Sequence, residues 1–218
     1  MNGGTASAKN FAGNLGADWK VEHVSDLNGD GTDDLFLRNG TDGTVSVWEM
    51  NGGVASNKGY VGSLNSSWSI EGFADFNGDG KDDMLARNDS TGAVTVWEMD
   101  GATRLNAGYA GDLSSDWTVR GLADFNGDGK ADILAENSST GAVSVWEMDG
   151  SEAISKNYVK SLGEGESITA ITDVNGDGQA DIQITDASTN GIAFWEMDDG
   201  ELKRGVYGGH YYVDTQFL

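Results

Sequence analysis

The chain has 218 residues, a formal net charge of −23 and neither cysteine nor proline, so it can build one sizeable core or a compact repeat array without disulfides. A chain with this negative charge repels phosphate backbones and anionic lipids, which argues against nucleic acid and membrane surfaces as partners. No apolar run approaches the roughly 18 residues that a membrane span needs, so no membrane insertion is expected.

A period of 49 residues runs through the chain. The tripeptide Trp-Glu-Met recurs four times at this interval, starting at Trp48, and so does a nine-residue acidic segment, starting at Asp26. A constant period of this length indicates one supersecondary unit copied along the chain. We therefore predict one repeat domain over residues 1–218. Its repeats are expected at 1–49, 50–98, 99–147 and 148–196, followed by a partial repeat or cap at 197–218.

Four short strands are predicted in each repeat, and the second repeat shows them in order. The strand 68–74 leads into the acidic segment and the strand 83–87 leaves it. Turns rich in Asn, Ser and Gly then separate a strand at 93–99 from a weaker one at 103–109. Such segments are typical of antiparallel β structure. No stretch keeps a 3.6-residue period, so we expect little or no helix.

The third of these strands is apolar on both faces. Val94 and Val96 point to one side, while Trp97 and Met99 point to the other. A strand of this kind is covered on both sides, as in a sheet stacked between like sheets. We therefore predict an all-β fold, a β-propeller-type array of four four-stranded blades. A linear stack of sheets would also bury both faces and is the alternative.

The acidic segment is a candidate calcium loop. Aspartates at positions 1, 5 and 9 and asparagine at position 3 offer side-chain oxygens, and the variable position 7 can offer its backbone carbonyl. This oxygen set suits Ca²⁺ better than Mg²⁺ or Zn²⁺. Position 12 is never glutamate and the flanks are strand-like, which excludes an EF-hand. A plain acidic turn is the alternative, but four copies with identical oxygen positions argue against it.

The pattern Asp-x-Asn-Gly-Asp-Gly-x-x-Asp, followed by a Gly-x-Val-x-Val-Trp strand, resembles the bacterial FG-GAP/VCBS repeats, which are similar to the blades of the integrin α-subunit propeller. The resemblance covers essentially the whole chain, but such propellers usually have more blades, and the proline of the Phe-Gly…Gly-Ala-Pro signature is missing. It implies a secreted or cell-surface protein used in adhesion or ligand binding. It also implies about four calcium ions, one per loop, at Asp26, Asn28, Asp30, Thr32, Asp34, Asp75, Asn77, Asp79, Lys81, Asp83, Asp124, Asn126, Asp128, Lys130, Asp132, Asp173, Asn175, Asp177, Gln179 and Asp181.

The ends of the chain carry one surplus strand pattern. Met1 aligns with the methionine of Trp-Glu-Met and Tyr207 is in phase with the repeat, so the fourth-strand pattern occurs near 1–12 and 197–208 as well as between them. The surplus copy could lie beside the ring, start an incomplete fifth blade, or pair with another molecule, and two chains could combine into a larger ring. A homo-oligomer formed through the terminal strands is therefore one expected interaction.

Catalysis has little support in the sequence. The two histidines, His23 and His210, do not recur in register, and the loops account for the periodic carboxylates. Any ion in the loops is expected to fix the loop between two strands and not to catalyse. We therefore predict a non-enzymatic, calcium-stabilised extracellular module for binding or adhesion, with a glycan or a surface protein as its ligand.

A carbohydrate-binding lectin is the alternative function. Trp19, Trp68 and Trp117 begin strands near a blade edge, where an indole face could stack on a sugar ring. Glu166 replaces the tryptophan in the fourth repeat, so the position is not indispensable for packing. A role in filling gaps between blades is the other interpretation of these three residues.

Overall fold

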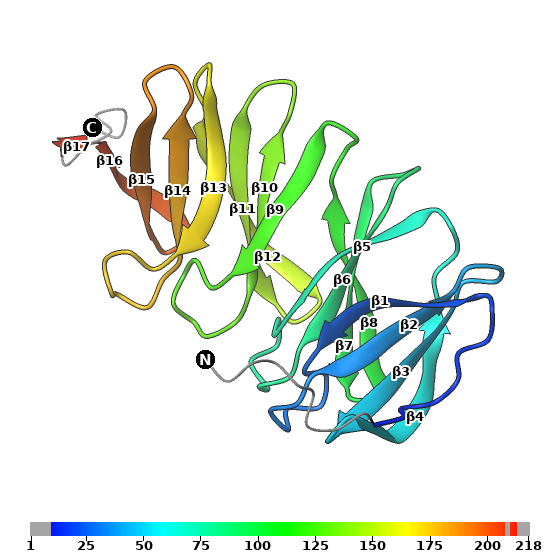
Figure 1. Cartoon of the computed structure of the whole chain (residues 1–218). Helices are drawn as coiled ribbons and strands as arrows, with labels where there is room; N and C mark the ends of the chain where they lie inside the picture. Colours follow the sequence, from blue (N-terminus) through cyan, green and yellow to red (C-terminus); the bar gives the residue numbers. More distant parts are fainter. Residues whose placement is uncertain (1–9, 208–209, 213–218) are drawn as a thin grey trace.

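The computed structural model describes residues 10–207 and 210–212, and all of the regular structure in them is β-strand. The strands form four antiparallel sheets in chain order, which we call blades 1 to 4 (Figure 1). Within these residues no helix is present that could cross a membrane. The predicted all-β array of four blades is therefore confirmed.

Each blade is a meander in which consecutive strands pair antiparallel. Blade 1 contains β1 (Trp19–Ser25), β2 (Asp34–Asn39), β3 (Thr44–Asn51) and β4 (Val54–Ser63). Blade 2 contains β5 (Trp68–Ala74), β6 (Asp83–Asn88), β7 (Ala93–Asp100) and β8 (Thr103–Asp112). Blade 3 contains β9 (Trp117–Ala123), β10 (Asp132–Asn137), β11 (Ala142–Asp149) and β12 (Glu152–Ser161). Blade 4 contains β13 (Glu166–Thr172), β14 (Asp181–Asp186), β15 (Gly191–Asp198), β16 (Glu201–Tyr207) and β17 (His210–Tyr212).

The strands begin where the sequence predicts, but the fourth strand is longer than predicted. The segment expected as a weak strand at 103–109 is the ten-residue β8, which pairs with β7 from end to end. The blades are also offset from the sequence repeats, because each blade starts at its first strand. Residues 201–207, assigned above to a partial fifth repeat, supply β16 as the fourth strand of blade 4.

The two-faced third strand explains how the blades stack. Val94 and Val96 of β7 are fully buried in a core cluster shared with blade 3. Trp97 and Met99 of the same strand are buried in a cluster shared with blade 1. The alternation of side chains along one strand thus supplies both interfaces of an inner blade.

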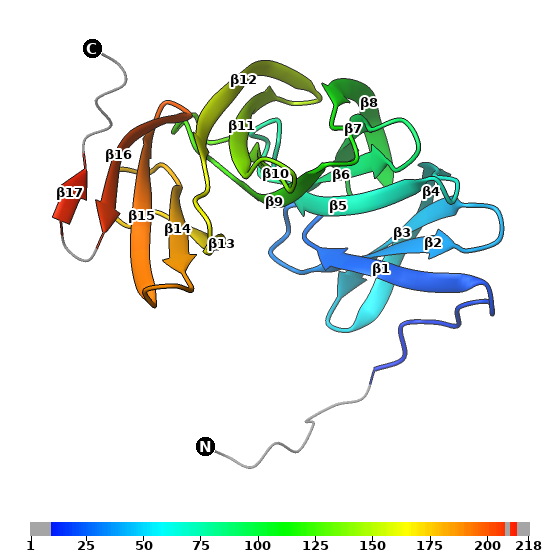
Figure 2. The same cartoon turned by 90° about the horizontal axis from the view of Figure 1, so that it is seen from above.

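The array is an open arc, with blade 1 at one end and blade 4 at the other (Figure 2). Three apolar clusters fill the interfaces between blades 1 and 2, 2 and 3, and 3 and 4. In the described part of the chain, no core cluster joins blade 4 to blade 1. Each blade has the four strands of a repeat, and blade 4 adds β17 as a fifth, so the surplus strand pattern is the N-terminal one. Its residues 10–12 lie against blade 1, where Asn10 Nδ2 donates to Gly52 O, and residues 1–9 lie outside the described residues.

Candidate functional site

Each acidic loop joins the first and second strands of a blade and is organised by its own side chains. In blade 2, Asp75 Oδ1 accepts the Gly78 N–H (2.6 Å) and Asp75 Oδ2 accepts the Gly80 N–H (2.7 Å). These two glycines have φ values of 78° and 82°, a region that favours glycine. The aspartate at position 1 therefore holds the backbone of the turn around its carboxylate.

The next two oxygen donors continue the same pattern. Asn77 Oδ1 accepts the Asp79 N–H (2.9 Å), and Asp79 Oδ1 accepts the Lys81 N–H (3.0 Å). The other loops repeat these bonds with N···O distances between 2.8 and 2.9 Å. In the fourth loop, the backbone N–H donors, Gly178 first among them, lower the pKa of Asp173. Local hydrogen bonds thus preform the turn and place its side-chain oxygens along the exposed rim of the blade.

The aspartate at position 9 behaves differently from the other predicted ligands. Asp83 is fully buried, its Oδ1 accepts the Met99 N–H (2.8 Å) and its Oδ2 accepts the Phe76 N–H (3.1 Å). The carboxylate therefore ties the loop to β7 inside the same blade. In all four blades this aspartate is buried and accepts a hydrogen bond from the N–H of the methionine in the third strand. The sequence pattern did not reveal this role, since a ligand and a buried buttress both require a carboxylate.

Burial shifts the ionisation of these four aspartates upward. Desolvation raises the pKa of Asp83 and of Asp132 to about 7, and that of Asp34 to about 6. The pKa of Asp181 is raised for the same reason. The backbone N–H donors act in the opposite direction but do not outweigh burial.

The loops offer the chemistry of a hard-cation site more clearly than its geometry. Positions 1, 3 and 5 place carboxylate and amide oxygens, the donors that Ca²⁺ prefers, on one short exposed turn. Within the described residues, no three acidic or histidine side chains converge closely enough to hold a metal ion. The donor set fits calcium, and ligation by the twenty residues named above remains a prediction.

The variable position 7 contributes more than a carbonyl. Lys81 Nζ lies 2.8 Å from Asp100 Oδ1 and 4.0 Å from Asp79 Oδ2, and Lys130 Nζ lies 2.6 Å from Asp149 Oδ1. The hydrogen bond to Asp100 raises the pKa of Lys81, so this side chain stays charged beside the loop. In these two loops an ammonium group therefore already balances part of the local negative charge.

The loops also connect the blades to one another. The Asp82 N–H donates to Asp26 O (3.0 Å), and the matching bonds to Asp75 O and Asp124 O measure 2.7 Å. Two strands further on, the Gly101 N–H donates to Leu27 O (2.6 Å). The acidic loops therefore form a hydrogen-bonded row along one rim of the arc, and any ion bound there would act on neighbouring blades together.

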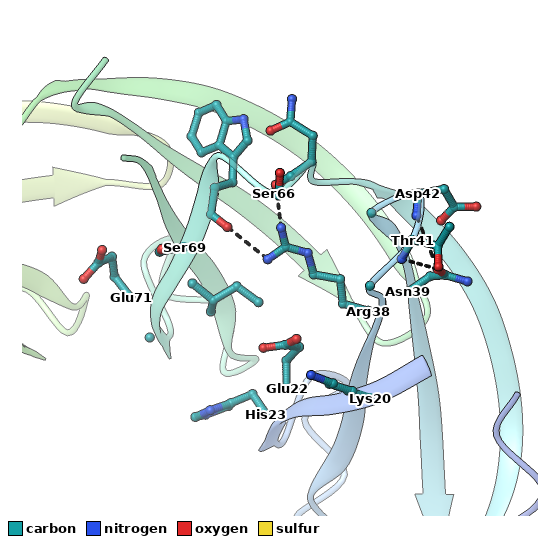
Figure 3. Close-up of a pocket in the computed structure, with 16 residues that line it drawn as sticks. Lys20, Glu22, His23, Arg38, Asn39, Thr41, Asp42, Ser66, Ser69 and Glu71 are labelled. Atoms are coloured by element: carbon teal, nitrogen blue, oxygen red, sulfur yellow. Dashed lines mark hydrogen bonds between the residues drawn. The ribbon is translucent and has the colours of Figure 1, made fainter. Parts of the chain in front are cut away.

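A second candidate site is a cleft of about 720 Å³ between the first strands of blades 1 and 2 (Figure 3). Glu22 of β1 and Glu71 of β5 line it, and each sits at a β-bulge, which redirects a side chain locally. Burial raises the pKa of Glu71, while the charge of Arg87 lowers it. Lys20 and Arg38 add positive charge to the lining. The cleft is polar and offers both signs of charge to a ligand.

Two of the cleft side chains have clear packing roles. The His23 ring stacks on Phe73 with centroids 4.3 Å apart and planes 8° apart. Arg38 donates to Trp68 O (2.9 Å), Leu64 O (3.1 Å) and Asn65 O, and so links blade 1 to blade 2. His210, the other histidine, lies in β17.

The tryptophans proposed as sugar platforms are only partly available. Trp68 and Trp117 are half-buried and pack against the core clusters between blades, although Trp68 also lines the cleft. Trp19 is half-buried at the open side of blade 1, where it lines a smaller cavity of about 160 Å³ with Leu15 and Trp48. The packing interpretation therefore applies to Trp68 and Trp117, and the cleft keeps Trp68 as a binding candidate.

Cation–π contacts cover the tryptophan of the Trp-Glu-Met strands in the first three blades. Lys58 Nζ lies 3.1 Å from the Trp48 ring centroid, and Lys156 Nζ lies 3.6 Å from that of Trp146. Arg104 takes this place over the Trp97 ring at 4.4 Å. Lys58 and Lys156 are equivalent in the repeat, but position 107 of the second blade is alanine and Arg104 supplies the cation from another position, so the 49-residue period did not reveal this contact.

The chain resembles known repeats in its sequence and known structures in its fold. The FG-GAP-like repeat model matches residues 26–86, 75–135 and 124–184, which together cover more than half of the chain. None of the curated proteins matches. Among solved structures, the chain is similar to part of the Photorhabdus luminescens Tc holotoxin pore, with a TM-score of 0.55 and 15% identity over 84% of this chain and 9% of that chain.

Two further structures are similar at lower scores. The V. cholerae biofilm matrix protein Bap1 has a TM-score of 0.40 and 19% identity over 85% of this chain and 28% of that chain. Kuenenia stuttgartiensis hydrazine synthase has a TM-score of 0.49 and 15% identity over 94% of this chain and 53% of that chain. The chain thus spans less than two thirds of each of these structures. At these identities the similarity bears on the fold alone, and only the holotoxin match is close enough to support it.

Proposed function

The chain belongs to the FG-GAP-like repeat family, and from this premise we propose that it is a calcium-stabilised extracellular module of the β-propeller type, which binds or adheres to other molecules and catalyses no reaction. The observation that supports calcium binding is the acidic loop itself. Four copies present carboxylate and amide oxygens at positions 1, 3 and 5 of a preformed turn. Oxygen ligands of this kind are the ones that calcium takes in proteins.

The expected role of the ions is structural. The chain carries a formal net charge of −23, and the loops lie in one row joined by backbone hydrogen bonds. Cations in that row reduce the repulsion between neighbouring loops. At a free calcium concentration about tenfold above the dissociation constant, each site contributes about 1.4 kcal/mol to the free energy of unfolding.

Thermal unfolding with calcium and with EDTA tests this role. Calcium is expected to raise the melting temperature of the full chain, and calorimetric titration to show binding at the loops. The variant Asp79→Asn removes one loop carboxylate and should weaken both effects. The matched control Asp116→Asn removes the same charge from an exposed residue outside the loops and should leave calcium binding unchanged. An unaltered melting curve in EDTA, together with no binding heat, would refute the calcium proposal.

Carbohydrate binding is a second candidate, supported by the cleft between blades 1 and 2. A sugar would find carboxylates at Glu22 and Glu71 for its hydroxyls and the Trp68 indole beside them. A glycan array with the full chain tests this function. Trp68→Ala should abolish any binding seen, whereas Trp117→Ala, which removes an equivalent packing residue outside the cleft, should retain it. Equal loss in both variants would reduce the effect to blade packing and reject the cleft as a sugar site.

A further inference from the structure

The two ends of the arc present the two halves of an interface that the chain already makes three times. We propose that blade 4 of one copy docks head to tail onto blade 1 of a second copy, and that two copies close an eight-bladed ring. The partner is another molecule of this chain, and the contact repeats the one between consecutive blades. The proposal goes beyond ligand binding and does not depend on it.

The open side of blade 4 corresponds to the side that each earlier blade buries. Ile192 is equivalent to Val45, Val94 and Val143, which are fully buried in the three interfaces, yet Ile192 is 51% exposed. Val174 is equivalent to Phe125 and is 41% exposed, whereas Phe125 is fully buried. Blade 4 therefore carries the apolar positions of the interface without a following blade.

The open side of blade 1 is the complementary half. Val21 and Val24 are equivalent to Ile70 and Phe73, which pack against the cluster between blades 1 and 2. At the end of the arc, Val21 is 42% exposed and Val24 is 47% exposed. A following copy would therefore offer to blade 4 the same positions that blade 2 offers to blade 1.

Backbone hydrogen bonds give the contact a register. Between blades, the N–H groups of Asp82 and Gly101 donate to the carbonyls of Asp26 and Leu27. The equivalent donors on blade 1 are the N–H groups of residues 33 and 52, and the equivalent acceptors on blade 4 are the carbonyls of residues 173 and 174. Docking in the repeat register pairs both donors with both acceptors.

The segment 10–16 already occupies the place of a preceding blade. Lys58 Nζ donates to Ala12 O (3.4 Å), and Gly13 lies against Trp48 and Lys58 as Gly62 lies against Trp97 and Arg104 in the next blade. Leu15 is 40% exposed, whereas the equivalent Leu64 is 3% exposed because it packs on blade 1. The side chain that would cover Leu15 belongs to a blade in front of blade 1.

The number of copies follows from the blade count. A head-to-tail contact either closes into a ring or continues as a filament. Two copies of four blades give eight, which lies at the upper end of the usual range for propellers, about four to eight blades. Three copies would exceed this range, so a closed pair is the expected assembly.

Sedimentation velocity over a concentration series, at about 0.15 M salt, tests the contact. The full chain is expected to show the mass of two copies, and Ile192→Glu should weaken the association about 100-fold by placing a charge in the contact. The control Ile154→Glu changes a similarly exposed isoleucine (58%) on the outer strand β12 and should have no effect. A strict monomer, or a dimer that Ile192→Glu leaves intact, would overturn the proposal.

A mixing experiment separates head-to-tail docking from other dimers. Ile192→Glu damages only the blade 4 side and Val24→Glu only the blade 1 side, so a mixture of the two variants has one undamaged contact. The mixture should therefore associate more tightly than either variant alone, and equal association would overturn the head-to-tail arrangement. Running each series in calcium and in EDTA, with circular dichroism to confirm folding, separates this contact from the proposed calcium sites.

Discussion

Blade 2 and blade 4 carry the same strand pattern but stand in different surroundings. Blade 2 buries both faces, and Leu85 and Val94 are fully buried on its side toward blade 3. At the equivalent positions blade 4 has Gln183, which is half-buried, and the exposed Ile192. The strand pattern thus decides that a blade forms, while the place of the blade in the arc decides which of its apolar positions are covered.

The largest expected difference between these blades is in core truncation. Phe76→Ala removes a fully buried ring between blades 2 and 3 and should cost about 3–5 kcal/mol in free energy of unfolding. Val174→Ala changes the equivalent position of blade 4, which is 41% exposed, and should cost less than about 1 kcal/mol. Urea unfolding at a concentration where the chain is monomeric measures both. Similar costs for the two variants would show that blade 4 is covered in solution.

The buried aspartates give a pH dependence that should be stronger in the inner blades. Burial raises the pKa of Asp83 and Asp132 from 3.8 to about 7, and that of Asp34, in an end blade, to about 6. Between these values the folded chain binds more protons than the unfolded chain. Their contribution to stability is therefore complete below pH 3.8 and is lost as the pH rises through 6 for Asp34 and through 7 for the inner pair.

Carboxyl ¹³C NMR in EDTA checks this order directly, and urea unfolding at several pH values checks its effect on stability. The carboxyls of Asp83 and Asp132 should titrate near pH 7, above that of Asp34 near pH 6. In calcium the titration should move to lower pH if position 9 helps to hold the ion, because a bound cation favours the charged carboxylate. Titration of all these carboxyls near 3.8 in EDTA would contradict burial as the dominant influence.

The sequence predicted the architecture well because its signals repeat. The period of 49 residues, the acidic loop and the two-faced third strand located every blade and the start of its strands. Interactions that do not repeat escaped it. Arg104 and Lys156 cover equivalent tryptophans from different repeat positions, and the stack of His23 on Phe73 occurs once.

Other features are invisible to sequence for a physical reason. The position 9 aspartate satisfies the same pattern as a ligand and as a buried buttress, and only its hydrogen bonds to Met99 and Phe76 distinguish the second role. Whether the first and last blades meet depends on small rotations between consecutive blades, which leave no residue signature. The open arc and its exposed Ile192 and Val24 therefore came from the structure.

The smallest predicted difference is between blade 3 and blade 4 and lies in the cation–π contacts. Lys156 Nζ is 3.6 Å from the Trp146 ring centroid in blade 3, whereas the nearest lysine to the Trp195 ring of blade 4 in these contacts is Lys160, at 5.9 Å. Lys156→Gln should lower the free energy of unfolding by about 0.5–1 kcal/mol, since the attraction weakens once the charge is gone. Lys160→Gln removes the same charge at the edge of the interaction range and should have almost no effect, which makes it the matched control. Urea unfolding of both variants measures the difference. If both variants lose the same free energy of unfolding, the effect comes from the overall charge of −23, and the contact with the Trp146 ring does not stabilise the fold.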